Sequence, residues 1–148
     1  MSYLTPVSLR QAVESTLTSS LSGFTKSRYC FDIFPGSSRT LEHKSFAVGL
    51  GDTNLYTPRD RQKPTLGVPV TTDVLIAYTY RLRGDAMVAD YDAGMALEAD
   101  VLRAALTTSN SGLFSLTFIS ANRQVDGEGT VILVTLTLRA AFRLQLAD

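Results

Sequence analysis

Hydrophobic and polar residues alternate most regularly between residues 71 and 83. Every second residue from Val74 to Leu82 is apolar or aromatic, and the intervening residues become polar toward the end of the run. A two-residue period places one set of side chains against a core and the other set on the opposite face of a sheet. The segment is therefore predicted to be a strand with one buried face, and it ends at the turn Gly84-Asp85.

The first predicted helix runs from about Val7 to Ser22. Its apolar stripe recurs at every fourth residue and consists of Leu9, Val13, Leu17 and Leu21. Pro6 is typical of a helix start and Gly23 of a helix end, and Thr5 or Ser8 could cap the first turn. The opposite face is polar but largely uncharged, which is unusual for a helix in contact with water.

A second helix is predicted from roughly Asp90 to Thr108. Its expected apolar face consists of Tyr91, Met95, Ala99, Leu102, Ala105 and Leu106. Asp90 and Asp92 lie at its start, where the helix dipole favours negative charge. Together with Glu98 and Asp100 they could suggest a metal site, but helix capping and an exposed face explain four acids more simply.

Four further strands are indicated by alternation and turn signals. They are Arg28–Phe34, Lys44–Leu50, Leu113–Asn122 and Thr130–Leu146. The first two should pair as an antiparallel hairpin around Pro35-Gly36. At about 3.3 Å per residue the last strand would reach about 50 Å, so part of it is expected to pair outside its own fold or to bend at Ala140-Ala141.

Residues 51–70 carry the fewest signs of regular structure. The segment contains three prolines and two glycines, and Arg59, Arg61 and Lys63 make it locally basic. Because a structureless stretch of about 20 residues is uncommon inside a compact domain, we interpret it either as a solvated loop or as an arm that orders on a partner.

The order of elements is helix, strand, strand, arm, strand, helix, strand, strand. This order predicts an α+β fold in which a mainly antiparallel sheet of about five strands carries two helices on one face. At 148 residues the chain is expected to form a single domain over residues 1–148.

The composition argues against some classes of binding partner and for others. Fourteen basic residues balance 14 acidic ones, so there is no global field to hold nucleic acid, although DNA could pass by such a surface. The charged fraction of 19% is low and hints that another subunit covers part of the surface. No apolar run approaches the roughly 20 residues that cross a bilayer, so no membrane partner is expected.

No catalytic, metal or cofactor motif is legible. The single cysteine, Cys30, and the single histidine, His43, are better explained as a buried thiol and a loop residue than as a catalytic pair. Tyr78 and Tyr80 could stack bases, but tyrosines at a period of two are more often core residues. We therefore expect no enzyme activity and no cofactor.

Two stretches carry a resemblance to a known family. These are Asp73-Val74-Leu75-Ile76-Ala77-Tyr78-Thr79-Tyr80-Arg81-Leu82-Arg83, and Ala89-Asp90-Tyr91-Asp92 with the following Leu97-Glu98 and Val101-Leu102. With the element order, they resemble the tail terminator proteins of long-tailed bacteriophages, also called minor tail or neck proteins. The sequence match covers about 35 residues, whereas the topology covers most of the chain.

The resemblance implies a structural protein of the virion tail or neck, assembled in the host cytoplasm. Such proteins form a ring, usually of six copies, that caps the tail tube, stops its polymerisation and offers a surface for head–tail joining. The implied partners are further copies of the chain, the tail tube protein and the head–tail connector protein, with DNA only as passing cargo. We expect the arm and the final strand to carry the partner contacts. The candidate interface residues are Tyr56, Arg59, Arg61, Lys63, Arg139 and Arg143.

Two alternatives remain at this point. The chain could be another ring protein of the same particle, such as a tail tube or head–tail connector subunit. It could also be a small monomeric ligand-binding domain or enzyme, with polar groups converging around His43, Tyr78 or Tyr80.

Overall fold

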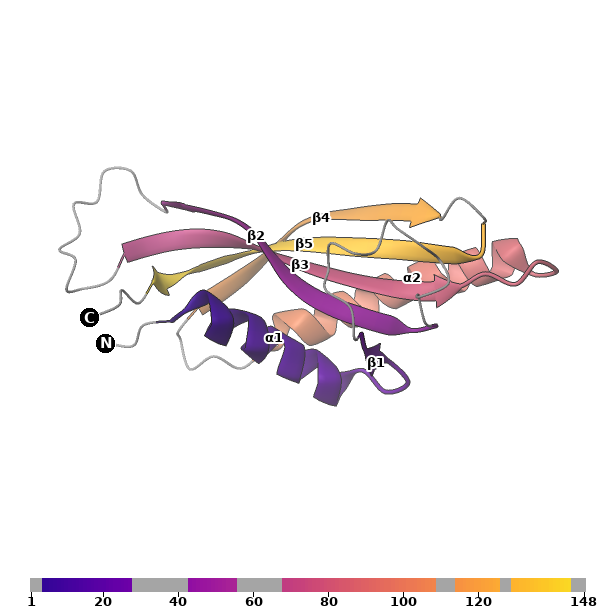
Figure 1. Cartoon of the computed structure of the whole chain (residues 1–148), viewed down its shortest axis with the longest axis horizontal. Coiled ribbons are helices and arrows are strands. Elements are labelled where there is room, and N and C mark those ends of the chain that lie inside the picture. Colours follow the sequence, from indigo (N-terminus) through magenta and orange to yellow (C-terminus); the bar gives the residue numbers. More distant parts are fainter. Residues whose placement is uncertain (1–3, 28–42, 56–67, 109–113, 126–128, 145–148) are drawn as a thin grey trace.

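The computed structural model describes residues 4–27, 43–55, 68–108, 114–125 and 129–144, which form a five-stranded mixed sheet and two helices (Figure 1). The elements in chain order are α1 (Pro6–Ser20), β1 (Thr25–Lys26), β2 (Ser45–Leu55), β3 (Val68–Arg81), α2 (Met87–Leu106), β4 (Phe114–Val125) and β5 (Val131–Leu144). Across the sheet the order is β1-β2-β3-β5-β4. The predicted α+β class, two helices and order of elements are confirmed.

The centre of the sheet consists of β3 and β5, two antiparallel strands of 14 residues each. They pair over their whole length, from Val68 opposite Leu144 to Arg81 opposite Val131. On its other side β5 pairs with β4, so its backbone is used within the chain. Over Val131–Leu144 no backbone pairing outside the fold is needed, because β3 begins earlier than predicted and matches β5 in length. Packing of this strand on a partner, or a bend at Ala140-Ala141, stays a prediction.

Both strands next to the predicted arm are longer than the sequence indicated. β2 continues through Gly51–Leu55, and β3 begins at Val68 although Pro69 follows immediately. The last β2–β3 pair joins Leu55 to Val70, so Pro69 lies beyond it, where a missing N–H costs no bond to β2. Residues 56–67, the remainder of the predicted arm, lie outside the described residues.

The first strand of the sheet differs from the predicted hairpin. β1 is a two-residue strand at Thr25–Lys26 and pairs parallel to β2, with Thr25 opposite Ser45. The predicted strand Arg28–Phe34, and with it the proposed antiparallel pairing, lies outside the described residues.

Each outer long strand contains a β-bulge. In β4, Phe118 is opposite Leu138 and Ser120 is opposite Thr137, so Ile119 is an extra residue. In β2 the register shifts between Leu50 and Thr53. An extra residue exchanges the two faces of a strand, and in β4 this turns the later residue Arg123 toward the helices.

One face of the sheet forms the core with both helices (Figure 1). The large, fully buried side chains are Leu9, Val13 and Leu17 from α1, Val101 from α2, Phe46 from β2, and Val74, Ile76, Tyr78, Ile132, Val134, Leu136 and Leu138 from β3 and β5. A second cluster, of Ala47, Ala77 and Leu133, lies on the opposite face. The buried alternation of β3 and β5 thus explains why both helices pack on the same side.

Helix α1 is close to its prediction. The Thr5 hydroxyl accepts a 3.1 Å hydrogen bond from the Ser8 amide and caps the first turn, with Pro6 as the first helical residue. Beyond the helix, Gly23 has a φ of +83°, a conformation that glycine adopts without strain.

Helix α2 starts earlier and is rotated relative to its prediction. It begins at Met87, and its buried residues are Asp90, Gly94, Val101, Ala104 and Ala105. Of the predicted apolar face, Ala105 is fully buried and Tyr91, Met95 and Leu102 are partly buried against the core, while Leu106 is 44% exposed. The helix lies close against the sheet at Gly94, where a Cβ atom would lie 3.1 Å from Cβ of Tyr80 and 3.2 Å from Cγ2 of Ile132. A side chain at this position would press on both residues, so glycine suits the close approach.

Among the described residues, neither helix has the length and apolar character needed to cross a bilayer.

Candidate functional site

The end of β3 is joined to the start of α2 by a two-pronged ion pair. The Arg83 side chain donates from Nε to Oδ2 of Asp90 at 2.9 Å and from a terminal nitrogen to Oδ1 at 3.0 Å. The Arg83 backbone amide donates a third bond to Oδ2 at 2.8 Å. These hydrogen bonds, from the side chain first and then from the backbone, lower the pKa of Asp90 below its ordinary value. Asp90 is therefore a buried carboxylate with both oxygens engaged.

His43 lies on the other side of the same strand end. Its Nδ1 accepts a 3.0 Å hydrogen bond from the Arg81 backbone amide, so in the neutral imidazole Nε2 carries the hydrogen. Its ring meets the Tyr80 ring edge-on, with centroids 4.6 Å apart. Partial burial, followed by the charges of Lys44 and Arg81, lowers the pKa of His43, with Asp90 acting in the opposite direction. His43 is thus held neutral at physiological pH.

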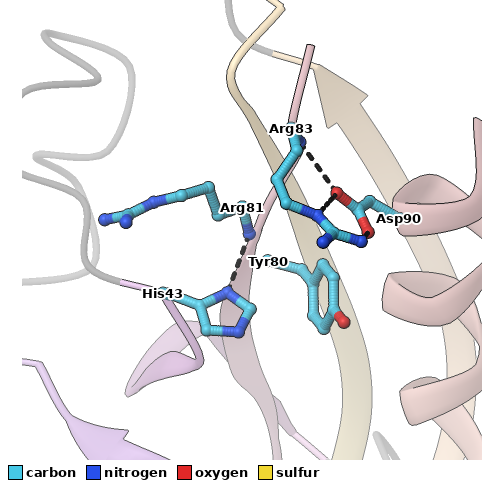
Figure 2. A pocket seen from close by; sticks show the side chains of 5 residues that line it. All are labelled: His43, Tyr80, Arg81, Arg83 and Asp90. Carbon is cyan, nitrogen blue, oxygen red and sulfur yellow. Dashed lines mark hydrogen bonds and ion pairs between the residues drawn. The ribbon is translucent and has the colours of Figure 1, made fainter. Parts of the chain in front are cut away.

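These residues surround an open pocket of about 420 Å³, lined by His43, Tyr80, Arg81, Arg83 and Asp90 (Figure 2). Figure 2 shows the Tyr80 ring beside the imidazole of His43 and below the guanidinium of Arg83, while the side chain of Arg81 extends away from the ring. No serine, threonine or cysteine is among the five lining residues. With Asp90 bound to Arg83 rather than to His43, the lining lacks a nucleophile–base–acid arrangement.

The acids of α2, considered above as a metal site, pair separately. Asp90 binds Arg83, and Asp100 lies 3.9 Å from Arg103. Glu98 pairs with Arg123 of β4, with contacts of 2.8 and 3.0 Å. Within the described part of the chain, no three His, Cys, Asp or Glu residues gather as they would around a metal ion.

The second candidate site is the outer edge of the sheet at β4. Among the described strands only β5 pairs with it, on its inner side. Phe118, Ile119 and Val125 of this strand are 42%, 42% and 46% exposed. A long edge strand that exposes large apolar side chains is a template for pairing with another chain.

The opposite edge of the sheet is partly covered. β1 pairs with the first residues of β2, and the Arg10 side chain lies 3.4 Å from the Val48 carbonyl. Beyond that point Gly51–Leu55 are exposed, and within the described ranges they pair only with β3.

The six interface residues predicted from the sequence are not brought together. Tyr56, Arg59, Arg61 and Lys63 lie outside the described residues. Arg139 is exposed on β5, opposite Asp73 of β3, with its Nε 3.4 Å from Oδ1 of that residue. The backbone carbonyl of Arg143 accepts a 3.0 Å hydrogen bond from the Leu4 amide, which ties the N-terminal segment to the end of β5.

Sequence reasoning missed the roles of Arg83 and Asp90. The local pattern indicates only a turn at Gly84-Asp85 and a helix-capping acid at Asp90. The one available signal is that an arginine ends a strand and an aspartate follows seven residues later, in the first turn of a helix. That spacing can bring opposite charges together across a tight strand–helix connection.

Neither a protein-family model nor a curated protein matches this sequence. Among solved structures, a chain of the virion of the native gene transfer agent (GTA) particle is 18% identical, with a TM-score of 0.55, over 96% of this chain and 99% of that chain. A crystal structure from Akkermansia muciniphila (14% identity, 100% of this chain and 83% of that chain, TM-score 0.39) is less similar. So is an Akkermansia muciniphila structure without its transmembrane region (13%, 100% and 91%, TM-score 0.38). Over nearly its whole length, the chain therefore shares its fold with a chain of the GTA virion.

Proposed function

We propose that this chain is a structural virion protein that forms the terminator ring of a phage-like tail. The observation that carries the proposal is the fold shared with a GTA virion chain over 96% of one chain and 99% of the other. The more specific role, that of a tail terminator, comes from the sequence resemblance to that family. A ring of six copies caps the tail tube, stops its growth and offers the surface for head–tail joining.

In this role the chain works without catalysis or a cofactor, at the neck of the virion, after assembly in the host cytoplasm. Its partners are further copies of itself, the tail tube protein and the head–tail connector protein, and DNA only passes through the ring. The balance of 14 basic and 14 acidic residues is consistent with a channel that lets DNA slide.

Neighbouring subunits meet through the two edges of the sheet. The β4 edge of one copy faces the exposed β2 segment Gly51–Leu55 of the next, because these are the long strands with a free side among the described residues. β2 runs in the same direction as β5, and β4 runs opposite to β5. A neighbour in the same orientation therefore continues the antiparallel alternation. A contact between two different surfaces closes into a ring when its rotation is suitable.

The arm at residues 56–67 contacts the tube or the connector in this proposal. Its charges are Arg59, Arg61 and Lys63, with Tyr56 beside the end of β2. Arg139 and Arg143, near the same end of the sheet, add to this surface. The pairing of Val68 with Leu144 supports this grouping, since it places one flank of the arm beside the end of β5, while Leu55, at the other flank, pairs with Val70 one strand away.

Electron microscopy of the chain mixed with tail tubes of its own particle tests the proposal. A terminator appears as rings of fixed size at tube ends, and tube length stays constant when tube subunits are added later. Tubes that lengthen by incorporating the chain would identify a tube subunit instead. Bare tube ends, with rings bound to the head portal, would identify a connector. Bare ends and no rings would point to a monomeric domain.

A further inference from the structure

The pocket at the end of β3 has no part in the proposed ring contacts. It lies where β3 leads into α2, with β2 and the loop residue His43 on one side (Figure 2). The β4 edge is separated from β3 by β5. The proposed edge segment of β2 pairs with Val70–Thr72, at the opposite end of β3 from the pocket, so a role of the pocket does not require edge pairing.

The carboxylate and imidazole acceptor atoms of the pocket are already engaged. Both oxygens of Asp90 accept hydrogen bonds from Arg83, and Nδ1 of His43 accepts one from the Arg81 amide. The donors are in excess. Nε2–H of His43 is directed away from that bond, and the Arg83 guanidinium has five N–H groups, of which Asp90 uses two. A ligand entering the pocket meets mainly donors.

The net charge of the lining is positive, so it favours an anionic ligand as the excess of hydrogen-bond donors does. Among the five lining residues, Arg81 and Arg83 contribute two positive charges and Asp90 one negative charge, which leaves a net charge of +1. Asp85 adds a negative charge near Arg83. Lys44 lies close enough to depress the pKa of His43 further. The pocket is therefore suited to an anion with acceptor oxygens, which would form charge-assisted hydrogen bonds there.

The aromatic residues of the lining indicate which class of anion fits the pocket. The rings of Tyr80 and His43 pack edge to face and offer an apolar wall beside the donors. A glutamate or aspartate side chain combines an apolar stem with a carboxylate head and matches both features. A nucleic acid fits less well, because the chain has no net charge and a polyanion needs an extended basic surface.

We propose that this pocket binds a carboxylate side chain from an acidic segment of a partner protein. The carboxylate accepts hydrogen bonds from Nε2 of His43 and from the N–H groups of Arg83 that Asp90 leaves unused, and its stem lies against Tyr80.

Because His43 is the single histidine, its imidazole resonances in the NMR spectrum of the full chain report on this pocket alone. The probes are acetyl-glutamate amide, the matched neutral acetyl-glutamine amide and a short DNA duplex, all at equal ionic strength. We expect the glutamate probe to shift the His43 resonances saturably and to raise the pH midpoint of their titration. A negative charge beside the imidazole favours its protonated form.

Two variants locate the binding. His43→Asn keeps a side-chain acceptor for the Arg81 amide but removes the Nε2 donor. It should weaken glutamate binding about five-fold, followed through the backbone amides of residues 80–83. Arg103→Gln removes an exposed cation of α2 outside the pocket and should leave binding unchanged.

Equal shifts with the glutamate and glutamine probes, or no saturable shift with glutamate, would overturn the proposal. So would tighter binding of DNA than of glutamate, which would make the pocket a nucleic-acid contact.

Discussion

The phenolic hydroxyl of Tyr78 donates a 2.7 Å hydrogen bond to the backbone carbonyl oxygen of Gly94. Tyr78 is fully buried in β3, and Gly94 is a point at which α2 lies close against the sheet. The missing side chain of Gly94 and the hydroxyl of Tyr78 are thus two parts of one contact. Because α2 carries Asp90 one turn earlier, this contact also positions the pocket.

Gly94→Ala tests the close approach. An added Cβ would lie 3.1–3.2 Å from Tyr80 and Ile132, so the helix or these two side chains must move apart by a few tenths of an ångström. We expect a loss of about 1–3 kcal/mol in the free energy of unfolding, despite alanine's better helix propensity. Gly84→Ala is the matched control, because a Cβ added there would meet no described atom within 4 Å and no loss is expected. Urea denaturation of both variants measures the difference, and equal stabilities would contradict this account.

Tyr78→Phe tests the hydrogen bond without changing the packing of the ring. The variant should lose about 0.5–1.5 kcal/mol of unfolding free energy, the usual net value of one hydrogen bond, as measured by urea denaturation. Burial raises the pKa of Tyr78. In an alkaline absorbance titration of the folded proteins, Tyr78 should therefore not ionise in the ordinary range of tyrosine, around pH 10, and the wild type and the variant should show equal absorbance changes there. A wild-type change larger by one tyrosine in that range would show that the phenol is open to solvent.

The sequence predicted most of the sheet because β3 and β5 alternate strictly, and a two-residue period has only one structural interpretation. It did not predict the rotation of α2. Hydrophobicity favours Leu106 for the core, whereas the face that turns inward carries Gly94, packed against Tyr80 and Ile132. That packing involves residues of β3 and β5, and the hydrophobic pattern of the helix alone does not encode it.

The local sequence pattern likewise did not predict the β-bulge at the sheet edge or the ion pair that lines the pocket. Nothing around Ile119 signals a bulge, since the alternation on either side of it is weak. The pairing of Asp90 with Arg83 depends on the geometry of the connection between β3 and α2. An aspartate in the first turn of a helix is compatible with both a capping role and an ion-pairing role, so the sequence does not distinguish the two.

Asp90→Asn should destabilise the protein at neutral pH and cease to do so in acid. The pKa of Asp90 is lowered by its hydrogen bonds to Arg83, so the unfolded chain binds the proton more readily than the folded one. The stabilisation is therefore complete above the ordinary pKa of 3.8 and is lost as the pH falls through the lowered value. Thermal melting of both proteins at several pH values measures this, with Asp92→Asn, an exposed neighbour, as control. A constant difference down to the lowest pH would contradict the assignment.

His43 predicts a second pH dependence, in a higher range. Its pKa is lowered by partial burial and then by Lys44 and Arg81, so protonation favours the unfolded chain. The stabilisation is present above its ordinary pKa of 6.5 and declines as the pH falls below it. As no other side chain ordinarily titrates near pH 6, His43→Asn should flatten the melting temperature between about pH 5.5 and 7. A wild-type profile already flat in this range would refute the prediction.

Ile119→Lys tests whether the β4 edge joins the subunits of the ring. Ile119 is the bulged residue of that edge and is 42% exposed. A lysine there should leave the monomer folded, because little of the core is disturbed, but oppose pairing with another strand through its charge. We expect rings to be lost in light scattering and electron microscopy, with an unchanged circular dichroism spectrum. Val88→Lys is the control, since Val88 is 76% exposed and belongs to α2 rather than to an edge strand, and it should leave rings intact. Rings that persist in Ile119→Lys, or that are lost equally in both variants, would exclude the β4 edge as the specific subunit contact.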